Sequence, residues 1–192
     1  MVRLSLVVLA IALPACSSLS VDRVEPWHQT DLSGAWNDTD ARIVADGITE
    51  RLNTEISGVY LGTEPSVIVG ALRNRGTESV DLRAIERWIE TKLIRGGALQ
   101  VVAGADMRPE LRSERQSQSE WAREETQAAM RAETGAGYLL QGTLHTWEDR
   151  QGRQTVRTYR VDVNLVDLET TEQVWAGSEE IKKVIRTRVL GM

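Results

Sequence analysis

The sequence predicts an α/β fold, in which one mixed β-sheet of about five strands has helices packed on it and ends in an antiparallel meander. Three observations lead to this prediction. The first half alternates helical stripes of apolar residues with short β-branched runs, and the last third shows period-two alternation broken by turns. The length of 192 residues, of which 41% are hydrophobic, is typical of one domain.

Two helices are expected in the first half. Asn37, Asp38 and Thr39 are typical helix-starting residues, and apolar side chains then recur at helical spacing until Gly58. The second helix shows an amphipathic stripe that two glycines close. Its marker residues are Leu82, Ile85, Ile89, Leu93, Gly96 and Gly97.

Residues 110–133 read as a surface helix, or two, because most are good helix formers and few are apolar. We expect this segment to pack along a narrow stripe. Trp121 within it and Trp88 on the preceding helix are both expected in the core, since large aromatic side chains are usually well buried.

Five strands are expected. Two are short apolar runs that alternate with the helices, and three form the meander through turns at 149–152 and 168–171. The last of them is followed by Lys182, Lys183, Arg186 and Arg188, which either meet an anionic surface or, as we expect, lie in a frayed tail. The expected strands cover residues 67–72, 99–103, 138–147, 159–165 and 172–180.

Composition excludes several function classes. The net charge of −5 and the lack of a basic block argue against nucleic acid as a partner. One Cys excludes an intrachain disulfide framework and a Cys-based zinc cluster, and two His leave little room for a His-rich metal site. No phosphate loop, dinucleotide fingerprint or nucleophile elbow is present, and His145 lies inside an expected strand. We therefore predict no cofactor, no small-molecule substrate and no enzyme activity.

The first residues predict export and lipidation. Residues 1–15 combine a basic start with an apolar stretch that is too short to span a bilayer. Leu13-Pro14-Ala15-Cys16 resembles the bacterial lipobox, which implies cleavage after Ala15 and acylation of Cys16. Ser17 in place of Asp favours the outer membrane, again by resemblance. More than one acyl chain on Cys16 would anchor the protein stably.

Residues 16–31 are expected to hold the lipidated Cys and a short flexible tether, and residues 32–192 the globular domain. Fully extended, the tether reaches at most about 50 Å, and as a coil it averages about 20–25 Å. The domain is therefore expected close to its membrane.

Seven segments, in order, carry a family resemblance. They are Ser33–Asp40 (SGAWNDTD), Val67–Asn74 (VIVGALRN), Leu99–Ala103 (LQVVA), Gly137–Thr143 (GYLLQGT), Tyr159–Thr170 (YRVDVNLVDLET), Val174–Gly177 (VWAG) and Ile181–Lys183 (IKK). This pattern resembles the LpoB family, lipoprotein activators of class A penicillin-binding proteins. The resemblance implies a domain similar to the TolB N-terminal domain that docks on a peptidoglycan synthase and stimulates it without catalysing a reaction itself.

The resemblance leaves the client open. The best-known members have a long Pro-rich tether that crosses the cell wall, whereas this tether has about fifteen residues. Either the synthase extends further towards the outer membrane, or this member has a different client. Alternative functions are a structural or secretion-assembly lipoprotein using the same domain, and, more weakly, a periplasmic hydrolase.

Two groups of residues are candidate partner contacts. Trp36, Asn37 and Asp38 form the first, although a structural role for Trp36 beside a capped helix is the favoured interpretation. The second is a basic cluster that would meet an acidic partner, or else form a solvated face. Its members are Arg108, Arg112 and Arg115.

Overall fold

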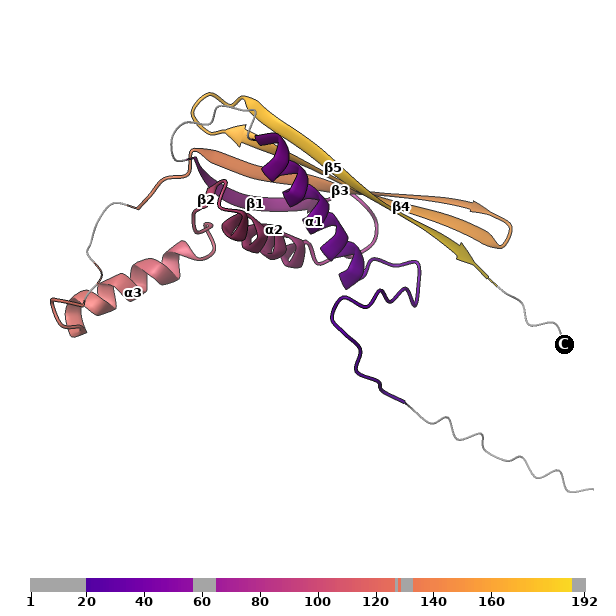
Figure 1. The fold of residues 1–192 in the computed structure, drawn as a ribbon, viewed down its shortest axis with the longest axis horizontal. Coiled ribbons are helices and arrows are strands. Elements are labelled where there is room, and N and C mark those ends of the chain that lie inside the picture. The colour runs from indigo at the N-terminus through magenta and orange to yellow at the C-terminus, as the bar shows by residue number, and fades with distance from the viewer. Residues whose placement is uncertain (1–19, 57–64, 127, 129–132, 188–192) are drawn as a thin grey trace, which may run out of the picture.

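The computed structural model describes residues 20–56, 65–126, 128 and 133–187. Five strands form one mixed sheet in the order β2-β1-β3-β4-β5 (Figure 1). β1 pairs in parallel with β2 and β3, whereas β3, β4 and β5 are antiparallel neighbours. The predicted mixed sheet with a C-terminal meander is confirmed. The strands are β1 (Ser66–Asn74), β2 (Gln100–Val101), β3 (Tyr138–Gln151), β4 (Gln154–Asp167) and β5 (Gln173–Arg186).

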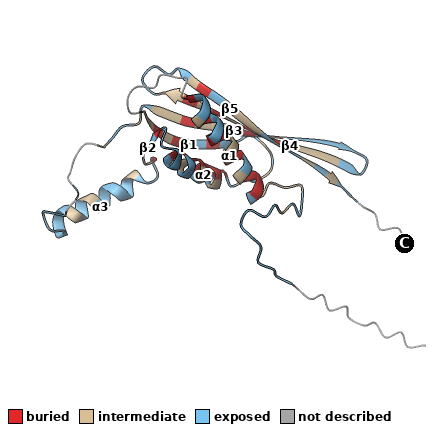
Figure 2. Ribbon diagram, in the orientation of Figure 1, coloured by how far each residue is buried: buried red, intermediate tan, exposed pale blue. Residues whose placement is uncertain are grey.

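Two helices, α1 (Asp38–Glu55) and α2 (Leu82–Gly96), lie side by side against one face of the sheet (Figure 1). Buried residues concentrate where these helices meet the strands (Figure 2). Trp88 packs against this core while remaining half-buried. The largest fully buried side chains are Tyr159, Ile48, Leu52, Ile85, Ile89, Leu93, Leu140, Leu144 and Leu165.

Local capping explains where the helices begin and end. Asn37 and Asp40 form a capping box, in which each side chain accepts a hydrogen bond from the other residue's backbone N–H. α2 ends at Gly96 and is capped by Gly97, whose φ of 68° is left-handed and suits glycine. α1 ends at Glu55, and the predicted end at Gly58 lies outside the described residues.

The meander strands run further than predicted. β3 continues to Gln151, a turn with Gly152 at φ 57° follows, and β5 extends to Arg186. The frayed tail predicted for residues 182–188 is therefore wrong for residues 182–186, and Arg188 lies outside the described residues. Past the helices one face of these strands is exposed and the other is half-covered by residues 33–35. Because Arg157 and Lys183 lie on the half-covered face, the ladder of backbone hydrogen bonds continues without apolar alternation in the sequence.

The third helix, α3 (Arg108–Trp121), also differs from the prediction. It is shorter than expected, has no buried residue and projects away from the sheet (Figure 1). Trp121 is 85% exposed, so its predicted place in the core is wrong. The adjoining edge strand β2 spans only two residues, where the sequence predicted five, and offers α3 little surface to pack against.

Candidate functional site

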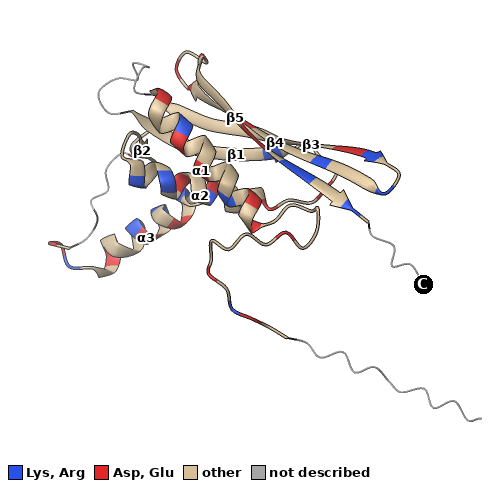
Figure 3. Ribbon diagram, turned by 45° about the vertical axis from the view of Figure 1, so that its right-hand side comes forward, with Lys and Arg blue, Asp and Glu red and all other residues tan. Residues whose placement is uncertain are grey.

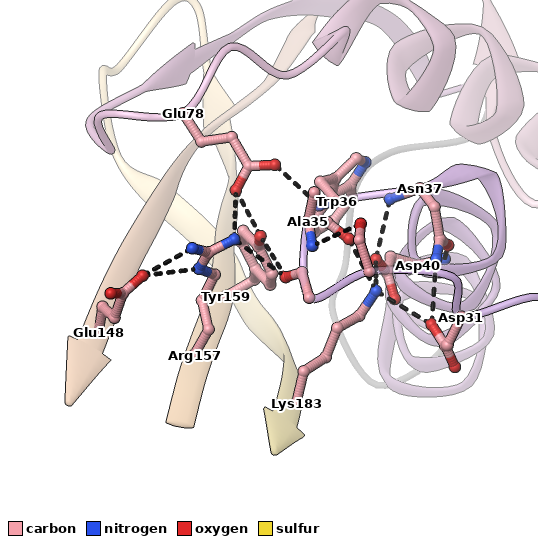
Figure 4. Close-up of polar contacts among 12 residues, drawn as sticks. Asp31, Ala35, Trp36, Asn37, Asp40, Glu78, Glu148, Arg157, Tyr159 and Lys183 are labelled. Atoms are coloured by element: carbon pink, nitrogen blue, oxygen red, sulfur yellow. Dashed lines mark hydrogen bonds and ion pairs between the residues drawn. The ribbon is translucent and has the colours of Figure 1, made fainter. Parts of the chain in front are cut away.

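A polar network holds residues 31–37, which we call the N-terminal strap, against β4 and β5 (Figure 4). The Trp36 ring meets the Tyr159 ring edge-on, with ring centroids 5.2 Å apart. The Trp36 backbone N–H donates to one oxygen of Glu78 at 2.9 Å, and the Tyr159 hydroxyl donates to the other at 2.5 Å. Burial, together with that bond to Glu78, raises the pKa of Tyr159 to about 12.

Lys183 on β5 is the cation at the centre of the strap. Its Nζ lies 2.6 Å from an oxygen of Asp40 and 3.1 Å from one of Asp31, and it donates to the Ala35 carbonyl at 2.9 Å. The side chains of Lys183 and Asp40 are only 10% and 4% exposed. This buried pair is well satisfied, because further donors and acceptors complete the hydrogen bonding of both groups.

Arg157 on β4 joins the strap to the neighbouring strand. Its guanidinium makes two bonds to one oxygen of Glu148, at 2.6 and 3.1 Å, and donates to the Gly34 carbonyl at 3.1 Å. Glu78 lies 3.5 Å away. The bond to Glu148 is the main reason that the pKa of Arg157 is raised and that of Glu148 is lowered.

The strap explains the first predicted contact group. Trp36 and Asn37 are occupied by internal contacts, while Asp38 is exposed and pairs with Arg42 at 3.1 Å. The structure brings all three to the start of α1, where the first two fix the domain's N-terminal edge. This arrangement matches the structural role that the sequence favoured for Trp36.

The second group lies on α3. Arg112 forms a bidentate pair with Glu133, at 2.8 and 3.0 Å, and Arg115 lies 3.4 Å from the same carboxylate. Hydrogen bonding in this pair lowers the pKa of Glu133. Arg108 donates from Nε to the Ala103 carbonyl at 2.9 Å. The basic cluster exists, but one carboxylate partly neutralises it (Figure 3).

An apolar stripe beside this cluster is the feature that the sequence interpretation missed. The spacing of Met107, Leu111 and Trp121 is i, i+4 and i+14, which places them on one side of α3. All three side chains are exposed. We call Met107–Trp121 the α3 arm. The sequence analysis predicts a narrow packing stripe in this segment and places Trp121 in the core, but it gives no role to Met107.

A polar hollow of about 520 Å³ lies over β3, β4 and β5. Arg160 and Asp162 within it pair with each other at 2.8 Å. The hollow is also lined by amide and hydroxyl side chains, which suit hydrogen bonding to a ligand better than they suit proton transfer. Polar residues in its lining include Arg73, Gln141, Thr143, Asn164, Gln173 and Ser178.

In residues 20–187, leaving out the undescribed gaps, no group of three or more His, Cys, Asp or Glu side chains is placed to hold a metal ion. The helices in that part of the chain are too short or too polar to cross a bilayer. His145 contacts Thr143 at 3.1 Å, and Cys16 lies outside the described residues.

The sequence matches the model of one known protein family over most of its length. The family model described as "Peptidoglycan-synthase activator LpoB" matches residues 43–181, well over half of the chain. The chain belongs to the LpoB family. The matched range runs from α1 into β5 and includes the α3 arm, Tyr159 and Glu78.

Solved structures similar to this LpoB-family chain include the three that follow. The Escherichia coli LpoB C-terminal domain is 15% identical, with 75% of this chain and 99% of that chain covered and a TM-score of 0.43. The Salmonella enterica LpoB C-terminal domain is 15% identical, with 72% of this chain and 98% of that chain covered and a TM-score of 0.42. Lipoprotein GNA1162 from Neisseria meningitidis is 14% identical, with 62% of this chain and 83% of that chain covered and a TM-score of 0.42. No curated protein sequence matches the chain significantly.

Proposed function

We propose that this protein is an outer-membrane lipoprotein that binds and activates a class A penicillin-binding protein, and so regulates peptidoglycan synthesis by contact instead of by catalysis. The observation that carries the proposal is the family match over residues 43–181, whose description is that of a peptidoglycan-synthase activator. The lipobox-like segment ending at Cys16 supports the anchor, with the domain on the periplasmic face.

Activation by contact places one physical demand on the interface. A bound protein shifts its synthase towards the active state only by the amount by which it binds that state more tightly. A ten-fold stimulation through such a shift needs about 1.4 kcal/mol of differential binding. One or two well-packed aromatic or aliphatic side chains are enough to supply this.

The α3 arm is the surface that best fits this demand. Isolated helices of about 12–15 residues are marginal in water, and α3 has 14 residues with none buried. It also displays Leu111 and Trp121 beside the Arg108–Arg115 cluster, and exposed Trp and Arg side chains are enriched at binding hot spots. We place the synthase contact here, with Trp121 as its apolar anchor.

Binding to the organism's own class A synthase tests this placement. The acylated chain in detergent is titrated against the purified synthase, with Trp121→Ala, Leu111→Ala and a control, Leu32→Ala, whose side chain is 94% exposed on the strap. We expect each α3 substitution to weaken binding at least about ten-fold and the control to leave it unchanged. Equal affinity for all four chains would remove α3 from the interface, and no binding by the unaltered chain would remove the proposed function.

The alternative, a structural or secretion-assembly lipoprotein, makes a different prediction for the same preparation. If the α3 arm joins copies of the chain, the protein forms closed rings, which electron micrographs would show. Rings without synthase binding would favour that alternative.

A further inference from the structure

The far end of the meander carries an exposed apolar patch. We define the ribbon tip as residues 147–158 of β3 and β4 with residues 180–187 of β5, which extend beyond the helices (Figure 1). Trp147 on β3 is 54% exposed and stacks on His145, and Val184 on β5 is 48% exposed. Val156 pairs with Val184, and Thr158 pairs with both Trp147 and Lys182, so these side chains share one face of the ribbon.

The ribbon tip is basic although the chain is acidic. Its residues include six Lys or Arg and three Asp or Glu, a net charge of +3 against −5 for the whole sequence (Figure 3). Two of the three acids, Asp149 and Glu180, lie on the Trp147 face together with Lys182 and Arg186, whereas Arg150, Arg157 and Lys183 lie on the opposite face. Within the described ranges, Arg153, Lys182 and Arg186 make no ion pair and remain open to an external anion. Ion pairs within the chain hold the other cations, which are Arg150, Arg157 and Lys183.

The N-terminal strap brings the tether to this same end of the domain. Arg157 donates a hydrogen bond to the Gly34 carbonyl, and Lys183 donates one to the Ala35 carbonyl. A hollow of about 450 Å³ is lined by strap residues 33–35 together with the turn residues Gly152 and Arg153. Because about fifteen residues separate Cys16 from the strap, a lipid anchor on Cys16 keeps the strap, which lies beside the ribbon tip, within about 50 Å of the bilayer.

We propose that the ribbon tip docks on the anionic phospholipid surface that holds the anchor, with Trp147, Val156 and Val184 at headgroup depth and Lys182 and Arg186 on lipid phosphates. The anchoring step rests on the proposed function. Trp favours the membrane–water interface, and each cation near an anionic leaflet strengthens binding about five-fold. α3 projects from the opposite end of the molecule, so docking directs the α3 arm away from the membrane (Figure 1).

Trp fluorescence tests the docking in the full acylated chain. The protein is reconstituted into vesicles that contain phosphatidylglycerol and acyl-brominated lipids, which quench only the Trp residues that touch them. We expect Trp147→Phe to remove a large share of the quenching, whereas Trp121→Phe, the matched control on the α3 arm, removes none. In vesicles of phosphatidylcholine alone, or at high salt, the Trp147 contribution should fall.

Charge variants complete the test. Lys182→Gln together with Arg186→Gln should shift the docked-to-free ratio about 25-fold towards free. The matched pair Arg95→Gln and Arg123→Gln, exposed positions away from the tip, should leave that ratio unchanged. Quenching that is insensitive to Trp147→Phe, or a Trp147 response to purified synthase or wall glycan but not to vesicles, would overturn the proposal.

The two proposals fail in distinguishable ways. Docking can be lost while synthase stimulation persists in detergent, which would leave the proposed function intact. Conversely, a chain that lacks acyl groups on Cys16 by mass spectrometry, yet shows quenching that depends on Trp147 when mixed with anionic vesicles, would keep the docking and remove the anchor.

Discussion

Lys183 offers the sharpest test of how the N-terminal strap is held. Replacing Lys183 by Met keeps the aliphatic stem but removes the charge that lies 2.6 Å from Asp40. Breaking a buried pair by removing one partner costs about 3–5 kcal/mol. Asp40 keeps the bond from the Asn37 backbone N–H, so we take the lower end, about 3 kcal/mol.

The adjacent Lys182 is a natural control. It lies on the opposite face of β5, is exposed and pairs with no acid in the described part of the chain, so Lys182→Met should change the free energy of unfolding by no more than about 0.5 kcal/mol. With a urea m-value of about 2 kcal/mol/M, Lys183→Met should lower the unfolding midpoint by about 1.5 M, and Lys182→Met by no more than about 0.25 M.

A double-mutant cycle isolates the pair itself. Asp40→Asn in the Lys183→Met background should cost less than it does alone, with a coupling energy of about 1–3 kcal/mol. Trp fluorescence during urea unfolding reports each chain. If Lys183→Met and Lys182→Met gave the same midpoint, or if the substitutions at 40 and 183 were additive, the strap would not depend on this contact.

Three further predictions concern stability. The pKa of Tyr159 is raised from its ordinary value of 10.0 to about 12, so the contribution of the protonated phenol to stability is fully present below pH 10 and is lost as the pH rises from 10 towards 12. Tyr159→Phe should lose part of this alkaline decline, measured as urea unfolding midpoints across that pH range. The pKa of Glu148 is lowered from 4.5, so the contribution of its carboxylate to stability is present above pH 4.5 and is lost as the pH falls below that value. Glu148→Gln should reduce this loss of stability at low pH in the same assay. An unchanged loss would refute the pairing with Arg157. Gly142→Ala would place a Cβ 2.3 Å from the Asp162 carbonyl and should cost about 1–3 kcal/mol by thermal unfolding, whereas Gly135→Ala meets nothing within 4 Å and should cost far less.

Local signals predicted the central part of the fold well. The α2 stripe at Leu82, Ile85 and Ile89 and the alternation around Tyr159 both come from residues that face one continuous core. The start of α1 followed from Asn37, because helix capping involves residues only three positions apart. These elements needed no knowledge of distant contacts.

The ends of the molecule could not be predicted in the same way. Beyond Trp147 the strands are held by cross-strand backbone bonds, and the period-two pattern is hidden because charged residues such as Arg157 and Lys183 lie on the half-buried face while Val184 lies on the exposed one. The strap depends on pairs such as Lys183 with Asp40, which are far apart in the sequence and leave no local pattern. Trp121 was misplaced because an aromatic residue on a helix is usually buried, whereas α3 has no surface of the domain beneath it.

Glycan polymerisation by the organism's own class A synthase tests the central claim most directly. The rate at which the purified synthase polymerises its lipid-linked precursor should rise when the acylated chain is added, and Trp121→Ala should reduce that rise while Leu32→Ala leaves it intact. A polymerisation rate that stays the same at saturating concentrations of the unaltered chain would contradict the account.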